Sequence, residues 1–528
     1  MSILLRKTVF YVLLLVYLIV CPLVILYVLG YIFKPGIEPG LVTTGLIHLS
    51  TLPSGASVYL GNSRYTERTP TVIRDLLPGG YPVRVVLKDH EPWSRTVFVQ
   101  PKKATALAPL LLWPKQPNRT QLLPGAFQSL IPLSGSRFLI LMNGRQPEGG
   151  IVYDSGSGES WPLVNSNSPF RGGRIQWHAS VEGSPFLLMR LRLPKQERFL
   201  GLELKHRHTQ SVDLTRLFPD RPIQVQWSSH IPNPLFALSA DGFLDQIDID
   251  TMAIHPRIMG PVLGYGLYHT TLYALMEDGS VRKRDHGNEN DEILIRHPYL
   301  SKMFTESKGL WRLTVLAENR VLFHGPQGQL LANVPPYGLA KRDVLGFEWD
   351  RHRQRLLVWQ SNAIGILDIS KLWKFPEERA LSQRNPTDTS AAVAYQAQGS
   401  RSFSTQIDSR IADSKRNEGS NSVPLSTESL TRWVFHQGRQ IQQAFWALQG
   451  NYILFLDEDA VFLLEAASWT DGQPRRLLMV RPGSSIGYME GTGMLYYLDA
   501  VTARLSAIEI VPRKSLSLLP SLLDNVSE

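Results

Sequence analysis

The stretch Leu235–Ile249 reads LFALSADGFLDQIDI and joins an apolar run to an alternating run through an Asp-Gly pair. Asp-Gly between two such runs is a hairpin signal, because its residues accept positive φ angles. The same order recurs along the chain with Asp278-Gly279 or Gln327-Gly328 at the turn. The stretch therefore predicts one hairpin of a repeating β unit.

Similar units recur roughly every 40–50 residues, which is the spacing of β-propeller blades. We expect seven or eight units in a β-propeller-like domain over residues 122–512. A pair of β-sandwich domains is the alternative, and it would lack a contact between the first and the last unit. The sequence shows no strict WD or kelch signature. Further paired runs are 271–275 with 280–282, 355–359 with 364–369, 452–456 with 460–464, and 494–498 with 505–508.

One stretch inside this region has a different composition. Residues 376–429 are rich in Ser, Gln, Asn, Thr, Arg and Glu and contain few large apolar side chains. Such a segment buries too little apolar surface to offset its chain entropy. The sequence predicts a disordered polar insertion here and a C-terminal tail at 513–528.

The N-terminal part contains a long apolar run. Val9–Phe33 carries no charged residue, and a helix of that length exceeds the roughly 30 Å of a bilayer's hydrocarbon core. Pro22 lies inside the run, and lipid-embedded helices tolerate proline as a kink. A cleaved signal peptide, the alternative, has a shorter apolar region that ends in a small-residue cleavage site. We therefore expect an uncleaved transmembrane helix at 9–33, between a short N-terminus (1–8) and a linker (34–44).

The flanking charges predict the orientation of this helix. Arg6 and Lys7 precede the run, whereas Lys34 follows it with Glu38 close by. The positive-inside rule then puts the N-terminus in the cytoplasm and the bulk of the chain outside it. The chain's one cysteine, Cys21, lies in the run after a bulky valine, which favours a packing or lipid-facing role over lipidation.

After the linker, five short runs alternate apolar and polar residues between Pro and Gly turns, which is typical of a small β-sandwich. Pro53-Ser54-Gly55-Ala56 precedes the second run, and Leu77-Pro78-Gly79-Gly80-Tyr81 opens the fourth. This order of motifs resembles the PEGA domain family over about residues 45–99, with Gly61-Asn62 where the family has an acidic-glycine turn. The resemblance implies a small extracytoplasmic β module (45–112) of bacterial envelope proteins that contacts polysaccharide or protein. The runs are 46–51, 56–60, 71–73, 81–87 and 95–99.

The predicted fold class is thus mainly β: a transmembrane helix, a PEGA-like β-sandwich and a β-propeller-like domain of seven or eight blades. The chain has 55 Lys and Arg against 46 Asp and Glu, a net charge of +9. This surplus favours anionic surfaces such as lipid headgroups or acidic polymers. The basic residues do not form a dense stripe interleaved with aromatics, so we expect no nucleic-acid partner.

The sequence predicts no catalytic, cofactor-binding or metal-binding residue. It contains no P-loop or His-Glu-x-x-His motif. His206 and His208 would share one face of a strand, but Lys205 and Arg207 flank them and a third metal ligand is not apparent. We expect Asp245, Asp248 and Asp250 to be solvated positions of a strand and its exit, and Asp457-Glu458-Asp459 to be a charged, solvated hairpin tip. Six tryptophans could be binding residues on the surface of the domain, but core packing is expected for most of them: Trp177, Trp227, Trp311, Trp349, Trp359 and Trp446.

These observations predict a non-catalytic binding or scaffold protein of the bacterial cell envelope, anchored in the inner membrane and facing the periplasm or the exterior. Its expected partners are the lipid bilayer, through the helix, and an envelope protein or polysaccharide; no cofactor is expected. A propeller-based hydrolase or lyase acting on glycans is one alternative, and it requires clustered acids around a central funnel. A sensory ectodomain is the other, and residues 1–8 leave it almost no cytoplasmic output module.

Overall fold

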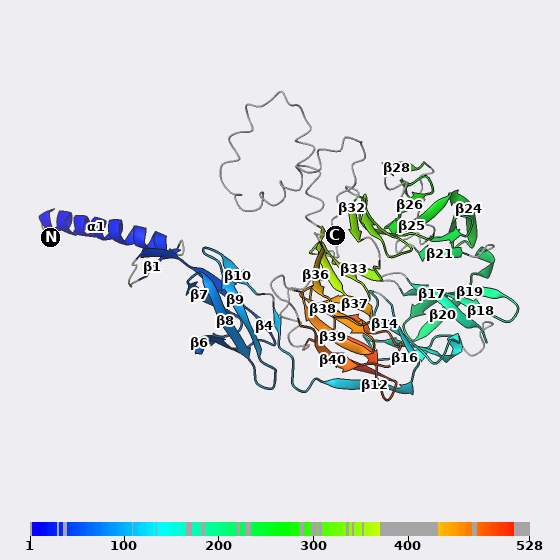
Figure 1. The fold of residues 1–528 in the computed structure, drawn as a ribbon, viewed down its shortest axis with the longest axis horizontal. Coiled ribbons are helices and arrows are strands. Elements are labelled where there is room, and N and C mark those ends of the chain that lie inside the picture. The colour runs from blue at the N-terminus through cyan, green and yellow to red at the C-terminus, as the bar shows by residue number, and fades with distance from the viewer. Residues whose placement is uncertain are drawn as a thin grey trace, which may run out of the picture.

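The computed structural model is mainly β, as the sequence predicts (Figure 1). The predicted insertion at 376–429 and the predicted tail at 513–528 lie outside the described residues. The structure describes residues 3–28, 31–34, 40–107, 109–133, 135–164, 172–180, 185–218, 222–227, 234–285, 290–296, 304, 309–333, 337–340, 343–350, 353–369, 431–466 and 473–511.

The helix α1 (Ile3–Val28) lies at one end of the molecule and contains Pro22. Its limits differ from the predicted 9–33. It begins earlier because Arg6 and Lys7 end the uncharged run but are compatible with a helix. It ends earlier because β1 (Tyr31–Lys34), whose first three residues favour strands, pairs antiparallel with β2 (Gly40–Thr43). The expected linker 34–44 therefore includes a strand.

Large apolar side chains of α1 are exposed from Val9 to Val20 and at Val24 and Ile25. In the part of the chain that the structure describes, no helix combines the length and the hydropathy required to cross a membrane.

The module (residues 45–111) consists of two main sheets, of order β10-β3-β7 and β6-β5-β8-β9. Side chains from both sheets, including Ile47, Val58, Val85 and Val97, form one buried cluster. The predicted small sandwich is present, with β4 and β11 paired in parallel beside it. Its strands are β3 (Gly45–Leu49), β4 (Thr51–Leu52), β5 (Ser57–Leu60), β6 (Ser63–Arg68), β7 (Thr71–Leu76), β8 (Gly79–Val86), β9 (Trp93–Val99), β10 (Ala104–Ala106) and β11 (Leu110–Leu111).

The propeller-like domain (residues 119–509) consists, in its described part, of eight four-stranded antiparallel sheets. Its first strand, β12 (Arg119–Ala126), pairs with its last, β43 (Arg504–Glu509), with Arg119 opposite Ile508. Figure 1 shows this cyan strand running along the red and orange sheets. Backbone hydrogen bonds thus join the two ends of the domain, a contact that separate sandwiches would lack.

Each of the other sheets is a run of four consecutive strands, so every strand pairs with its neighbour in sequence. The first four of these sheets are β13 (Ser129–Pro132), β14 (Phe138–Met142), β15 (Gly150–Asp154) and β16 (Ser160–Pro162); β17 (Arg174–Ser180), β18 (Phe186–Arg192), β19 (Glu197–Lys205) and β20 (His208–Asp213); β21 (Pro222–Trp227), β22 (Leu235–Ser239), β23 (Leu244–Asp248) and β24 (Ala253–Met259); and β25 (Val262–Tyr268), β26 (Thr271–Met276), β27 (Ser280–Arg284) and β28 (Glu292–Arg296).

The remaining sheets continue this pattern, and the last one includes β12. They are β29 (Arg312–Ala317), β30 (Arg320–His324), β31 (Leu330–Ala332) and β32 (Tyr337–Ala340); β33 (Gly346–Asp350), β34 (Arg355–Trp359), β35 (Ile364–Asp368) and β36 (Thr431–Phe435); β37 (Ile441–Ala447), β38 (Tyr452–Asp457), β39 (Ala460–Glu465) and β40 (Arg475–Met479); and β41 (Gly487–Met489) and β42 (Met494–Leu498) with β43 and β12. Short 3-10 helices lie at Pro147–Gly149 and Thr215–Leu217.

The predicted hairpin turns depend on glycine. Gly242, Gly279 and Gly328 have φ angles of 84°, 76° and 74°, in the left-handed region. Each follows the Asp or Gln that the sequence pattern places at the turn, and each connects the second and third strands of a sheet. Glycine occupies this region without the steric cost that a Cβ atom brings.

Two neighbouring sheets approach closely where β25 faces β29. A Cβ atom placed on Gly264 would lie 1.9 Å from the backbone oxygen of Trp311. The backbone nitrogen of Trp311 also donates a hydrogen bond to Leu263 O at 3.1 Å. The first strands of two adjacent sheets therefore touch backbone to backbone, and only glycine fits between them.

Candidate functional site: a docked module and a buried polar network

The module packs on the propeller-like domain through its short β4–β11 edge. Leu52, Leu111 and Trp113 belong to one buried apolar cluster with side chains of β38, β39, β40, β42 and β43. Burial of such side chains stabilises an interface by about 1.5–3 kcal/mol for each one fully buried. The propeller-like domain contributes to this cluster Ala447, Leu448, Tyr452, Leu454, Leu456, Val461, Leu463, Leu477, Leu478, Val480, Ile486, Leu495, Tyr497, Ile508, Ile510 and Val511.

A buried hydrogen bond fixes the module in register with this surface. The backbone nitrogen of Leu111 donates to the Tyr452 hydroxyl at 2.8 Å. Tyr452 is the first residue of β38, and burial raises the pKa of its hydroxyl well above the usual range. The hydroxyl is therefore neutral at pH 7 and accepts this hydrogen bond there.

Two ion pairs flank the apolar contact. Arg95 of β9 lies 2.8 Å from the Glu465 carboxylate at the end of β39, with 31% and 12% of their side chains exposed. Burial raises the pKa of Glu465, and the positive charge of Arg95 opposes this shift. Arg475 of β40 pairs with Glu91 and lies over the ring of Trp113, 5.7 Å from its centre. Apolar, hydrogen-bonded and ionic contacts therefore hold the two units together.

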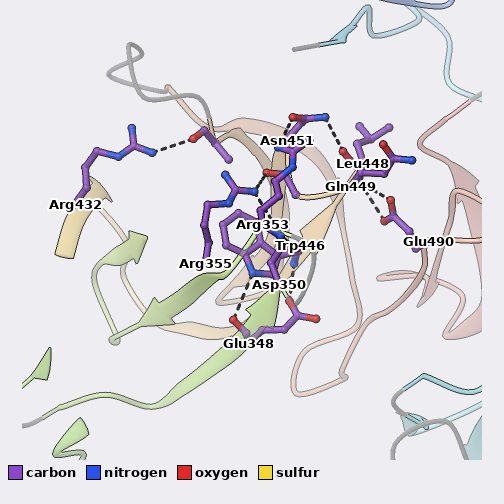
Figure 2. A network of polar contacts seen from close by, with 12 residues as sticks. Glu348, Asp350, Arg353, Arg355, Arg432, Trp446, Leu448, Gln449, Asn451 and Glu490 are labelled. Atoms are coloured by element: carbon purple, nitrogen blue, oxygen red, sulfur yellow. Dashed lines mark hydrogen bonds and ion pairs between the residues drawn. The ribbon is translucent and has the colours of Figure 1, made fainter. Parts of the chain in front are cut away.

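A polar network lies beside this interface, where three sheets of the propeller-like domain meet (Figure 2). Arg355 of β34 donates to the Asp350 carboxylate at 3.0 Å and to the Gly450 carbonyl. Its guanidinium lies over the ring of Trp446, 4.5 Å from the centre. The backbone nitrogen of Trp446 donates to Glu348 Oε2 at 2.6 Å. These contacts tie β33 and β34 to β37.

The network holds an unusual turn between β37 and β38. Leu448, Gln449 and Gly450 have positive φ angles of 54°, 55° and 73°, which is uncommon for residues other than glycine. The Glu490 carboxylate accepts hydrogen bonds from the backbone nitrogens of Leu448 and Gln449, at 3.2 and 2.6 Å. Leu448 also belongs to the buried cluster under the module. The network thus supports the surface on which the module docks.

The chemistry of this network is that of a support. The carboxylates of Glu348, Asp350 and Glu490 each accept hydrogen bonds from backbone nitrogens or from Arg355. Arg353 donates to the side chain of Asn451 at 2.7 Å. These side chains hold a backbone turn in place through their hydrogen bonds. The residues of this network do not include a nucleophile beside a general base.

The predicted histidine pair does not share a strand face. His206 and Arg207 form the turn between β19 and β20, and His208 begins β20. Arg207 has a φ angle of 64°, which places the turn one residue before His208. His206 lies 3.7 Å from the Glu159 carboxylate, which also pairs with Arg207. Within the described residues, no group of three His, Cys, Asp or Glu side chains is arranged to hold a metal ion.

The two acidic segments singled out in the sequence, around Asp248 and around Asp457, differ in burial. Asp248 accepts backbone hydrogen bonds from Asp250 and Thr251 at the β23–β24 turn. Hydrogen bonds from the Thr251 hydroxyl and backbone nitrogen hold the pKa of its carboxyl below the usual range. Asp457 was predicted to be solvated, and this is wrong: its side chain is buried, with the residue 8% exposed. Its carboxylate accepts hydrogen bonds from the backbone nitrogens of Arg439 and Gln440. The sequence gives no sign of these acceptor contacts, because the donors belong to a separate segment.

The tryptophans mostly pack in the interior. Trp311 is 0% exposed and makes an edge contact with Phe304, with ring centres 4.7 Å apart. Trp227 stacks on Phe186, with ring centres 5.0 Å apart. Trp349 and Trp359 pack against apolar clusters, Trp446 belongs to the polar network, and the side chain of Trp177 lies outside the described residues. Trp113 lies at the docking surface. It ends the apolar run Leu110–Trp113, which is the sequence signal for this interface.

The model of the PEGA domain matches residues 44–110. This confirms the resemblance seen in the sequence, and it covers only that segment of the chain. No curated protein matches the chain.

Among solved structures, the chain is similar to the β-propeller domain of Cps50 (Swd1) from Myceliophteria thermophila, with 10% identity and a TM-score of 0.35 over 74% of this chain and 99% of that one. It is similar to Hsv2 of Kluyveromyces lactis, with 8% identity and a TM-score of 0.35 over 66% and 98% of the two chains. PorZ, a surface component of the type-IX secretion system of Porphyromonas gingivalis, matches with 11% identity and a TM-score of 0.32 over 72% and 42%. The order of the sheets rests on the strand pairing of this chain itself.

Proposed function

We propose that this chain is a non-catalytic binding or scaffold protein of the bacterial cell envelope, with its β modules outside the cytoplasm. The observation that carries the proposal is the docking of the PEGA module on the propeller-like domain through Leu52, Leu111 and Trp113. Two β units that share a buried cluster and two ion pairs present one continuous surface to a partner. Such a surface suits an envelope protein or a polysaccharide.

Attachment to the membrane through α1 is part of the proposal. Its support is the run of exposed apolar side chains from Val9 to Val20, because an apolar surface of this extent is normally covered by lipid or by another protein. Arg6 and Lys7 before this run favour a cytoplasmic N-terminus.

The attachment is tested by expressing the full chain and a variant lacking residues 1–28 in a bacterial host. After alkaline carbonate extraction, we expect the full chain in the membrane pellet and the shortened variant in the supernatant. Recovery of the intact full chain in the supernatant would overturn this part of the proposal.

The binding role is tested by affinity purification of the tagged full chain from detergent-solubilised membranes. The double variant R95A/R475A removes both ion pairs of the docking interface, and R84A/R476A removes two exposed arginines as a matched control. We expect the wild type and the control to recover the same protein or polysaccharide, and the docking variant to recover less of it. Recovery of no specific partner by the wild type would contradict the proposal.

A further inference from the structure

A groove with a volume of about 870 Å³ lies between two neighbouring sheets of the propeller-like domain. It opens where β14 and β18 end and where β17 begins. The backbone nitrogen of Ile175 donates to Arg145 O at 2.8 Å, so a direct hydrogen bond joins its two walls. Ligand sites in proteins commonly have volumes of about 300–1,000 Å³, and the groove falls in this range.

The charged side chains that line the groove are all basic. Arg145, Arg174 and Arg192 are exposed in it, and its described lining includes no aspartate or glutamate. The carboxylate of Glu148 contacts one lining residue, because its Oε1 accepts a hydrogen bond from the backbone nitrogen of Gly172 at 2.6 Å. The groove therefore concentrates positive charge beyond the surplus of the chain as a whole.

The strand register places two of these arginines directly opposite each other. Arg174 of β17 faces Arg192 of β18 in the antiparallel ladder, and like charges at such positions destabilise a sheet. Glu197 faces Arg192 on the other side. Its carboxylate, however, is bound by Arg190 through two contacts of 3.1 and 2.6 Å. The Arg174–Arg192 pair is an arrangement that an anionic ligand would relieve.

We propose that this groove binds a ligand that carries two or more anionic groups, either carboxylates or phosphates. A guanidinium matches such groups with two parallel hydrogen bonds, and Arg174 and Arg192 supply two guanidiniums side by side. Ile131 and Leu193 in the lining are partly exposed and give the carbon skeleton of the ligand an apolar surface. The inference rests on the proposed binding role and names its ligand chemistry: an acidic oligosaccharide or a small polyphosphate.

The test measures binding to the detergent-solubilised full chain by titration calorimetry. The probes are an oligogalacturonate, a neutral oligosaccharide of equal length, and pyrophosphate. We expect saturable binding of at least one anionic probe, weakening with salt, and none of the neutral one. Binding of the oligogalacturonate alone identifies an acidic glycan as the source, and binding of pyrophosphate alone identifies a polyphosphate.

The double variant R174Q/R192Q should bind the anionic probe about tenfold more weakly or worse, since two charged contacts are lost. The control R84Q/R476Q removes the same charge from exposed strands elsewhere and should bind within about twofold of wild type. The thermal midpoint of R174Q/R192Q should equal or exceed that of the wild type, because a repulsion is removed. Unchanged binding by R174Q/R192Q, equal loss in both double variants, or no saturable anion binding by the wild type would overturn the inference. Membrane extraction and partner recovery are separate readouts, so failure here is distinguishable from failure of the binding role itself.

Discussion

Arg95 in the module and Glu465 in the propeller-like domain form an ion pair with a nitrogen–oxygen distance of 2.8 Å. The Glu465 side chain is 12% exposed, so it relies on Arg95 to offset the cost of burying a carboxylate. The pair lies next to the cluster that contains Leu111 and Trp113. The docking interface between the two units therefore depends on charge, and substitutions of Arg95 and Glu465 test this dependence directly.

Replacing Arg95 by alanine should destabilise the docked state. The change leaves Glu465 without its cationic partner, and because Arg95 is itself partly exposed the expected cost is about 1–2 kcal/mol. Chemical denaturation combined with limited proteolysis near residue 115 measures this loss. The control R84A alters an exposed arginine of β8 and should leave both readouts unchanged.

Stability should depend on pH through Glu465. Burial raises the pKa of its carboxyl in the folded protein above the ordinary value, so the folded state binds a proton more readily than the unfolded state. This contribution to stability is fully present below the unfolded pKa and is lost as the pH rises through the folded pKa. The E465Q variant should lack this part of the pH profile of the thermal midpoint. The R95A variant should show the loss at a higher pH than the wild type, and a loss at lower pH would contradict the assignment.

Replacing Tyr452 by phenylalanine removes a hydroxyl that accepts the hydrogen bond of the Leu111 backbone nitrogen. That nitrogen would then be buried without a partner, and we expect the free energy of unfolding to fall by about 1–3 kcal/mol. Equilibrium denaturation monitors the change. Tyr81→Phe is the matched control, because its hydroxyl donates to Leu77 O in an exposed hydrogen bond, and its loss should cost far less.

Replacing Arg355 by lysine keeps the charge but removes the planar guanidinium. A lysine ammonium does not reproduce the contacts to Asp350 and Gly450 together with stacking on Trp446. We expect a loss of about 2–3 kcal/mol, because the Asp350 side chain is only 9% exposed. Arg439→Lys, at an arginine whose side chain is 80% exposed, should change stability by less than about 0.5 kcal/mol.

A methyl group at Gly264 should be poorly tolerated. Its Cβ atom would lie 1.9 Å from the Trp311 backbone oxygen, so β25 and β29 would have to separate. We expect a loss of about 3 kcal/mol or more, seen as a lower thermal midpoint or as insoluble protein. Gly491→Ala is the control, because no heavy atom lies within 4 Å of its added Cβ. Equal stability of the two variants would show that the sheets are not in contact at this point.

Local patterns in the sequence were enough to predict the mainly β character, the hairpins at Gly242, Gly279 and Gly328, and the PEGA module. These features depend on neighbours a few residues apart, because turn chemistry and two-residue alternation are local properties. The limits of α1 were predicted less well. The end of α1 depends on the pairing of β1 with β2. The hydropathy of one segment contains no information on which strand it pairs with.

The amino-acid sequence alone determined which segments become strands, where they turn, and that the chain carries a basic surplus. Tertiary structure alone decided that β12 completes the sheet of β41–β43, that Trp113 docks on the propeller-like domain, and that Arg174 faces Arg192. The physical reason is the distance along the chain. Turn and strand preferences act between near neighbours, whereas burial, ion pairing and strand register bring together residues whose proximity is set by the packing of the whole molecule.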